Sequence, residues 1–458
     1  MRVTRRHFLG TLGAATAAGM PLPALAQGNA PGQLKPASWP WWRAESSVGA
    51  ALANGELPEL RRAPDLPLPL AYDWASRGAW LRSRFPDLKR HIVFEYYPWY
   101  ASDPWFHWDG EYRTPPLDLA ATSVPLLGPY DSRSTAVLEQ HAQWIAEAGV
   151  GAINLSWWGP GDFTDQAVPR IMDVMRAHDI HVAFHLEPYR DDRSQYYQRD
   201  ILYLLKEYGE RRHWDCLLVL RNADGKSGPV FKSFRTILPP SGRDCHGVLQ
   251  VTQDYTSDAS WQQQVASVRE TLRQDFDHIT LLADSLDFGR TRASGFDGIA
   301  IYDNYVRPSA WPAYAKDCNA FDLLFSFNCN PGYDGILARN VAPDSCYAPP
   351  SFEPPGYEID WSRVRDRGIA RRLGSDRITE SLYTTLQLQT DPSLANARKG
   401  FFLVYVNSFN EWHEGHQFEP MKDFAALSSA ERSLFYHNAL CGSYRLEELR
   451  QRLASVLQ

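Results

Sequence analysis

The chain has 458 residues, of which 44% are hydrophobic and 22% are charged, so it can bury a large core and is not intrinsically disordered. It contains 47 basic and 54 acidic residues and no long basic run, which argues against a nucleic acid partner. Aromatic residues make up 13% of the sequence. Such side chains pack in cores, and they also bind ligands with apolar faces and polar edges, sugars above all.

The first 26 residues are typical of an export signal. Arg5 and Arg6 stand in a basic head, a short apolar stretch follows, and a small-residue cleavage site ends at Ala26. The arginine pair resembles a twin-arginine signal, which predicts bacterial export of a folded protein to the periplasm or beyond. After this segment there is no run of 18 apolar residues. We therefore expect a mature product without a membrane span. We also expect a monomer.

The remainder divides by composition into two parts. Residues 27–88 are rich in proline and tryptophan and predict an extended arm laid across the main domain, which we assign to residues 89–458. Six cysteines are present, and Cys318, Cys329 and Cys346 are close enough in sequence to staple one loop. Buried free thiols are an equal alternative. The cysteine and histidine spacings do not suggest zinc, so no metal is predicted.

From residue 91 onward, apolar runs of strand length alternate with segments of helical period. Helices are predicted near residues 134–148, 165–178 and 195–211. Strands are predicted at residues 91–97, 151–158, 181–187, 216–220, 278–283, 297–302, 321–327 and 401–409. A strand and a crossover helix repeated about eight times predict an α/β fold, a (β/α)8 TIM-type barrel with elaborated loops.

Polar and aromatic residues gather where these predicted strands end. Because the C-terminal ends of barrel strands meet on one face, we expect these residues to share a site. The segments concerned are residues 95–100, 156–158, 185–189, 302–305, 327–333 and 407–414.

Glu411 and Glu414 form the strongest candidate pair, because an i, i+3 spacing on a helical turn brings two carboxylates to one face. Two such carboxylates can act as base and acid, as cleavage of a glycosidic bond requires. The alternative is a solvated pair at a helix start. His413-Glu414 begins like a zinc-binding HExxH helix, but Gln417 stands where the second histidine is needed.

Several collinear motifs then carry a family resemblance. SFNEWHEGHQFEP, at residues 408–420, resembles the closing motif of glycoside hydrolase family 99, the endo-α-mannosidases and endo-α-mannanases. YYPWY, SWWGPG, FHLEPY, GFDGI and NPGYD resemble other motifs of that family, at residues 96–100, 156–161, 184–189, 295–299 and 330–334.

The resemblance implies a (β/α)8 fold, no metal or organic cofactor, and retaining hydrolysis inside an α-mannoside-type chain, either an α-mannan-like glycan or a bacterial exopolysaccharide. Glu411 would then draw the proton from the sugar's 2-hydroxyl, so that O2 forms a 1,2-anhydro sugar. Glu414 would protonate the departing oxygen and later activate water. Such substrate assistance is a recognised exception to the two-carboxylate scheme.

The resemblance and the positions of the residues suggest the supporting roles. Glu187 matches a family acid that holds sugar hydroxyls, Asn410 is placed to orient a glutamate, and Trp412 either walls the pocket or packs beneath its loop. Further expected substrate contacts are Tyr97, Trp158, His185 and Tyr302, although each has an ordinary packing alternative.

The sequence departs from the family pattern in places. His416 and Phe418 replace a threonine and an isoleucine just after the glutamate pair, and Ala300 replaces a tyrosine. These changes affect the expected subsites more than the acid and base. Two other functions stay open: a catalytically silent periplasmic glycan-binding protein on a barrel scaffold, and a transferase acting on related glycans.

Overall fold

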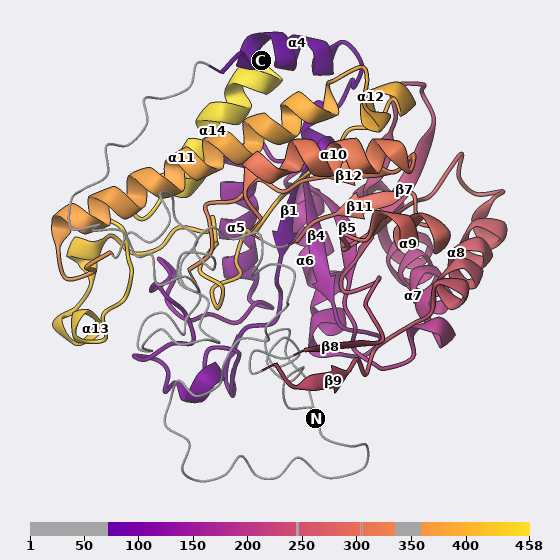
Figure 1. The fold of residues 1–458 in the computed structure, drawn as a ribbon. Coiled ribbons are helices and arrows are strands. Elements are labelled where there is room, and N and C mark those ends of the chain that lie inside the picture. The colour runs from indigo at the N-terminus through magenta and orange to yellow at the C-terminus, as the bar shows by residue number, and fades with distance from the viewer. Residues whose placement is uncertain (1–71, 244–246, 303, 305, 335–358) are drawn as a thin grey trace.

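We describe the fold from a computed structural model, which covers residues 72–243, 247–302, 304, 306–334 and 359–458. The predicted signal, the first part of the predicted arm, Cys245 and Cys346 lie outside these residues. The last part of the arm is helical, since α4 spans Trp74–Arg82. Its Arg82 donates to the carbonyl of Val456 in the C-terminal helix α14, 2.5 Å away, so the segment packs along α14 (Figure 1).

A sheet of parallel strands forms the centre of the molecule (Figure 1). Its strand order is β12-β11-β10-β7-β5-β4-β1-β13. A parallel bridge between Cys329, just after β12, and Val406 in β13 links the two ends of this order. The predicted (β/α)8 fold is confirmed. The strands are β1 (Ile92–Tyr96), β4 (Ala152–Trp157), β5 (His181–Leu186), β7 (Ser227–Ser233), β10 (Thr280–Ala283), β11 (Gly298–Ala300), β12 (Leu324–Ser326) and β13 (Val404–Val406).

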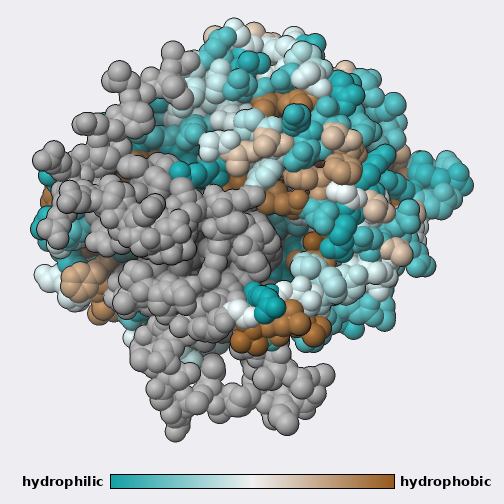
Figure 2. Space-filling view, in the orientation of Figure 1, coloured by the Kyte–Doolittle hydropathy of each residue, from teal (hydrophilic) through white to brown (hydrophobic). Residues whose placement is uncertain are grey.

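Helices follow the strands and cover the outside of the sheet (Figure 1). The hydrophilic surface on the side of α8 and α9 is visible in Figure 2, as expected where amphipathic helices face solvent. The helices are α5 (Thr135–Glu147), α6 (Phe163–Ala177), α7 (Tyr197–Leu204), α8 (Asp258–Leu272), α9 (Phe288–Ala293), α10 (Trp311–Ala320), α11 (Val364–Gln389), α12 (Ala395–Lys399), α13 (Ser429–Ser433) and α14 (Tyr444–Leu457). A π-helix at Leu205–His213 continues α7.

Short elements complete the chain. Two small antiparallel pairs lie outside the barrel, β2 (Ala101–Ser102) with β3 (Trp105–Phe106), and β8 (Ser241–Arg243) with β9 (Leu249–Val251). The 3-10 helices are Leu88–His91, Gly110–Tyr112, Arg193–Gln195, Trp214–Cys216, Pro308–Ala310 and Phe424–Ala426.

One predicted strand was wrong. In the apolar run 216–220, Leu217 forms an isolated parallel bridge with Val182 of β5, and the run then enters β6 (Val219–Arg221), which pairs antiparallel with β7 and lies off the main strand order. The fourth barrel strand is instead β7, which contains a glycine, a proline and Lys232 and so does not read as a buried strand. An apolar run identifies a buried segment, but it does not distinguish a barrel strand from the hairpin arm beside it.

Side chains alternate between the two faces of each strand and form two separate apolar clusters, one on each face of the sheet. Ile92, Phe94 and Tyr96 of β1 belong to the large core between sheet and helices, whereas Val93 belongs to a separate cluster with Ala183 and other apolar residues of the barrel strands and their flanks. Successive strand side chains point to opposite faces, so this second cluster fills the barrel interior. The next inward residue of β1 is Glu95, and the interior becomes polar from there towards the C-terminal ends of the strands.

Four cysteines, Cys216, Cys318, Cys329 and Cys441, are free thiols. Burial raises the pKa of Cys216 and of Cys329 to about 12, which makes both thiols unreactive. Within the part of the chain that the structure describes, we find no helix that is both long and apolar enough to cross a membrane.

Candidate active site

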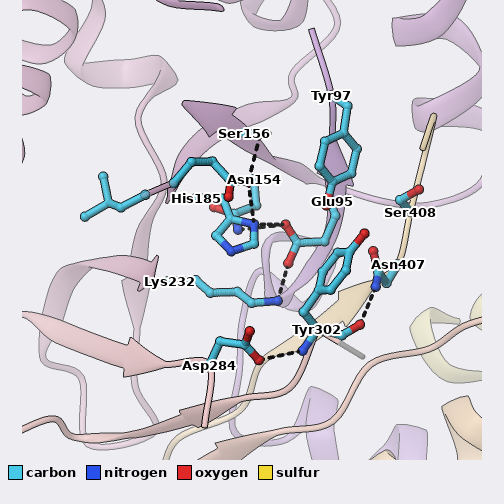
Figure 3. Close-up of polar contacts among 12 residues, drawn as sticks. Glu95, Tyr97, Asn154, Ser156, His185, Lys232, Asp284, Tyr302, Asn407 and Ser408 are labelled. Atoms are coloured by element: carbon cyan, nitrogen blue, oxygen red, sulfur yellow. Dashed lines mark hydrogen bonds and ion pairs between the residues drawn. The ribbon is translucent and has the colours of Figure 1, made fainter. Parts of the chain in front are cut away.

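The inward side chains of neighbouring strands form a charged layer, here called the strand layer, from Glu95, Asn154, His185 and Lys232 (Figure 3). Lys232 Nζ lies 2.6 Å from Glu95 Oε1, and His185 Nδ1 lies 3.1 Å from Glu95 Oε2. Asn154 Nδ2 donates to Glu95 Oε2 at 3.0 Å. Burial alone would raise the pKa of Glu95, but the Lys232 ammonium and His185 overcome it and hold that pKa well below its usual range.

Register explains why these four residues meet. Glu95 stands opposite Asn154 across β1 and β4, and His185 stands opposite Lys232 across β5 and β7. Each is the inward residue one step beyond the apolar interior cluster. The layer therefore follows directly from the strand alternation.

Glu414 lies towards the C-terminal end of the barrel and accepts two hydrogen bonds on one oxygen. The Tyr302 hydroxyl donates to Glu414 Oε2 at 2.5 Å, and His416 Nε2 lies 2.8 Å from the same oxygen. Glu414 is only 7% exposed and His416 is fully buried. Lys232 Nζ lies 5.5 Å from the centre of the Tyr302 ring, so the strand layer is directly in contact with the residues that hold Glu414.

Glu411, which is 2% exposed, has a different set of partners. Its Oε1 accepts the backbone N–H of His413 at 3.0 Å, and its own N–H donates to Ser408 Oγ at 2.8 Å. Burial and the nearby charge of Glu411 raise the pKa of Tyr100 well above its usual value. We call Glu411, Glu414, Tyr302 and His416 the turn group. The alternative of two solvated glutamates at a helix start is wrong, because both are buried and residues 412–415 form a turn.

The shape of this turn depends on Gly415. Gly415 has a φ of 68°, and a Cβ there would lie 1.8 Å from the carbonyl oxygen of Asp334. The Asp334 N–H donates to the Glu414 carbonyl at 3.0 Å, and Arg445 of α14 donates to the Gly415 and Gln417 carbonyls at 2.8 Å each. These contacts fix the backbone on both sides of Glu414.

Asn410 and Trp412 hold this loop through buried hydrogen bonds. The Asn410 amide accepts the N–H of Tyr97 at 2.7 Å and donates to the Tyr97 carbonyl at 3.0 Å. These bonds hold the loop after β1, whereas the sequence predicts that Asn410 orients a glutamate. Trp412 is fully buried and its indole N–H donates to Glu419 at 2.9 Å. This is the packing role that the sequence left as one of two alternatives.

The expected aromatic and polar partners of substrate gather around the turn group. Tyr97, Trp158, Tyr302 and Trp412 belong to one buried cluster. Glu187 Oε1 accepts from Ser156 at 2.9 Å and lies 3.8 Å from His185 Nδ1. The His185 and Tyr302 ring centres are 6.3 Å apart. The structure therefore brings all nine candidate residues into one connected network, and their roles towards substrate stay predictions.

Sequence reasoning missed Lys232, and it did not include Glu95 or His416 among the candidates. A signal for the first two exists: each is a lone charge inside a strand that is otherwise apolar, in IVFEY and PVFKS, and two opposite charges of this kind can neutralise each other. Among the described residues, no group of three or more His, Cys, Asp or Glu could hold a metal ion.

Comparisons with known proteins agree with this geometry. A family model described as Glycosyl hydrolase family 99 matches residues 87–231. The glycoprotein endo-alpha-1,2-mannosidase-like protein of Homo sapiens is 27% identical over 361 residues, which cover 71% of this chain and 67% of that protein. The glycoprotein endo-alpha-1,2-mannosidase of Xenopus laevis is 26% identical over 367 residues, covering 73% and 70%.

A solved structure supports the fold. The family 99 endo-alpha-mannosidase from Bacteroides thetaiotaomicron superposes with a TM-score of 0.57 at 19% identity, covering 80% of this chain and 97% of that one. The family match and the curated relatives support membership of glycoside hydrolase family 99, and they indicate a glycoside hydrolase with a carbohydrate substrate.

Proposed function

We propose that the chain cleaves internal α-mannoside-type bonds of a polysaccharide or oligosaccharide with retention, through a 1,2-anhydro sugar. The observation that carries this is the turn group: two buried glutamates on one turn, with Tyr302 and His416 on Glu414 and a backbone N–H on Glu411. The names of the relatives, one an endo-alpha-1,2-mannosidase and the other an endo-alpha-1,2-mannosidase-like protein, support the choice of sugar.

In the first step, Glu411 takes the proton from the 2-hydroxyl of the sugar. O2 then attacks the anomeric carbon as the glycosidic bond breaks, and Glu414 gives its proton to the departing oxygen. The products are a 1,2-anhydro sugar and a shortened glycan. The backbone N–H of His413 on Glu411 Oε1 keeps that carboxylate in place for its role as base.

In the second step, Glu414 is a carboxylate and takes a proton from water, whose oxygen attacks the anomeric carbon. The bond from that carbon to O2 breaks, and the proton on Glu411 returns to O2. Two inversions at one carbon give net retention. The donors on Glu414 Oε2 stabilise the carboxylate between the two steps.

The substrate is tested by incubating the protein with α-mannan oligosaccharides and with bacterial exopolysaccharides and measuring released reducing ends. Glu414→Gln and Glu411→Gln should each lower kcat/KM by about 10²- to 10⁴-fold, because each removes one proton transfer. Glu147→Gln, an exposed position on α5, is the matched control and should keep full activity.

The outcomes separate the alternatives. Binding without release of reducing ends, by the wild type as well as by Glu414→Gln, would contradict hydrolysis and favour a glycan-binding protein. Longer products in the presence of an acceptor would favour a transferase. A Glu414→Gln variant as active as the wild type would contradict the assignment of the acid.

We also propose that the protein is exported by a twin-arginine signal to the periplasm or outside the cell, on the basis of Arg5 and Arg6 in the sequence. Replacing both arginines by lysine should keep the precursor in the cytoplasm. Unchanged export of that variant in a bacterial host would contradict the proposal.

A further inference from the structure

His416 lies between the two glutamates of the turn group. Its Nε2 is 2.8 Å from Glu414 Oε2, and its Nδ1 is 3.1 Å from Ser408 Oγ, which accepts the N–H of Glu411. The Tyr302 hydroxyl is 3.3 Å from His416 Nε2. The side chain is fully buried, so its hydrogen bonds are made inside the protein.

These contacts set the tautomer of a neutral His416 when Glu414 is a carboxylate. A neutral imidazole carries a single N–H. The carboxylate oxygen 2.8 Å from Nε2 can only accept, so in that state the hydrogen belongs on Nε2. Nδ1 is then an acceptor and takes the hydroxyl hydrogen of Ser408, whose oxygen already accepts from Glu411. One chain of hydrogen bonds thus runs from the Glu411 backbone through Ser408 and His416 to Glu414.

We propose that His416 is a positioning residue for Glu414. Its Nε2–H donates to Glu414 Oε2 and stabilises the carboxylate that forms when Glu414 gives its proton to the leaving group. The proposal rests on the proposed role of Glu414 as acid and then base. It assigns to this chain a residue that controls the acid without touching the sugar.

Two variants test the donor. His416→Gln keeps an N–H donor, whereas His416→Leu loses it. Each is assayed on the natural glycan and on the glycosyl fluoride of the same oligosaccharide, since fluoride leaves without help from an acid. Glu414→Gln is measured in parallel, and thermal melting establishes that each variant is folded.

We expect His416→Leu to lower kcat on the natural glycan by about 10- to 100-fold and on the fluoride by less than about 3-fold. His416→Gln should keep kcat on the natural glycan within about 5-fold, because its amide can still donate to Glu414. Equal losses of His416→Leu on the natural glycan and on the fluoride, or equal losses of His416→Gln and His416→Leu on the natural glycan, would overturn the proposal. Full activity of Glu414→Gln on the natural glycan would instead overturn the proposed function.

Discussion

The barrel holds its buried carboxylates in two different ways. In the strand layer, Glu95 is neutralised by Lys232 and held by His185 and Asn154, all from neighbouring strands. In the turn group, Glu411 and Glu414 accept from a backbone N–H, a tyrosine hydroxyl and a histidine. The Lys232 cation holds Glu95 as an anion, whereas the proposed acid and base roles require Glu411 and Glu414 to gain and lose a proton.

Among the variants that test this comparison, Lys232→Met should cause the largest loss of stability. The variant leaves the Glu95 charge buried without its ammonium partner, which costs about 3–5 kcal/mol of unfolding free energy. The double variant Glu95→Gln/Lys232→Met removes both charges and should recover most of that loss. Urea unfolding of the three proteins measures it. A single variant as stable as the wild type would mean that the ion pair is not structural.

A smaller loss of stability is expected from a substitution in the turn that carries Glu414. Gly415→Ala places a Cβ against the Asp334 carbonyl at a positive φ, so the backbone around Glu414 must move. We expect a loss of about 1–3 kcal/mol in stability together with a clear loss of kcat. Gly161→Ala is the control, because Gly161 has a φ of 76° but no atom within 4 Å of the added Cβ. Equal losses of stability and kcat in the two variants would show that the contact with the Asp334 carbonyl is not their cause.

The smallest effect on stability concerns a fourth buried acid, Asp200 on α7. The Tyr189 hydroxyl donates to it at 2.8 Å, and burial raises its pKa to about 6. The folded state then binds more protons than the unfolded state between about pH 4 and 6, so stability falls as the pH rises through this range. Asp200→Asn should flatten that slope by about 1–2 kcal/mol in urea unfolding from pH 4 to 7. An unchanged slope would show that Asp200 titrates normally.

Local patterns predicted most of the barrel because they depend on residues close in sequence. The helix predicted at residues 134–148 is Thr135–Glu147, and the strand predicted at 91–97 is Ile92–Tyr96. The missed strand β7 shows the limit of such patterns. Lys232 is buried because Glu95, which is 137 residues away, neutralises it, and no pattern within β7 contains that information.

In the candidate site too, the sequence predicts what depends on nearby residues and not what depends on distant ones. Glu411 and Glu414 could be predicted because the motif places both on one short segment after a strand. The role of Asn410 could not, because it depends on Tyr97, which is 313 residues earlier in the chain. His416 stood in the motif as a departure from the family pattern, and only the distances to Glu414 and Ser408 give it a chemical role.

The most direct test of the central claim is the hydrolysis of a donor that lacks the 2-hydroxyl. Removing this electron-withdrawing group makes the glycosidic bond intrinsically easier to break, so a mechanism that does not use O2 would cleave the 2-deoxy donor readily. If Glu411 and Glu414 act through O2, the 2-deoxy donor binds and is not cleaved, while the parent donor is turned over. Ready turnover of the 2-deoxy donor, lost in Glu414→Gln, would contradict the anhydro-sugar mechanism.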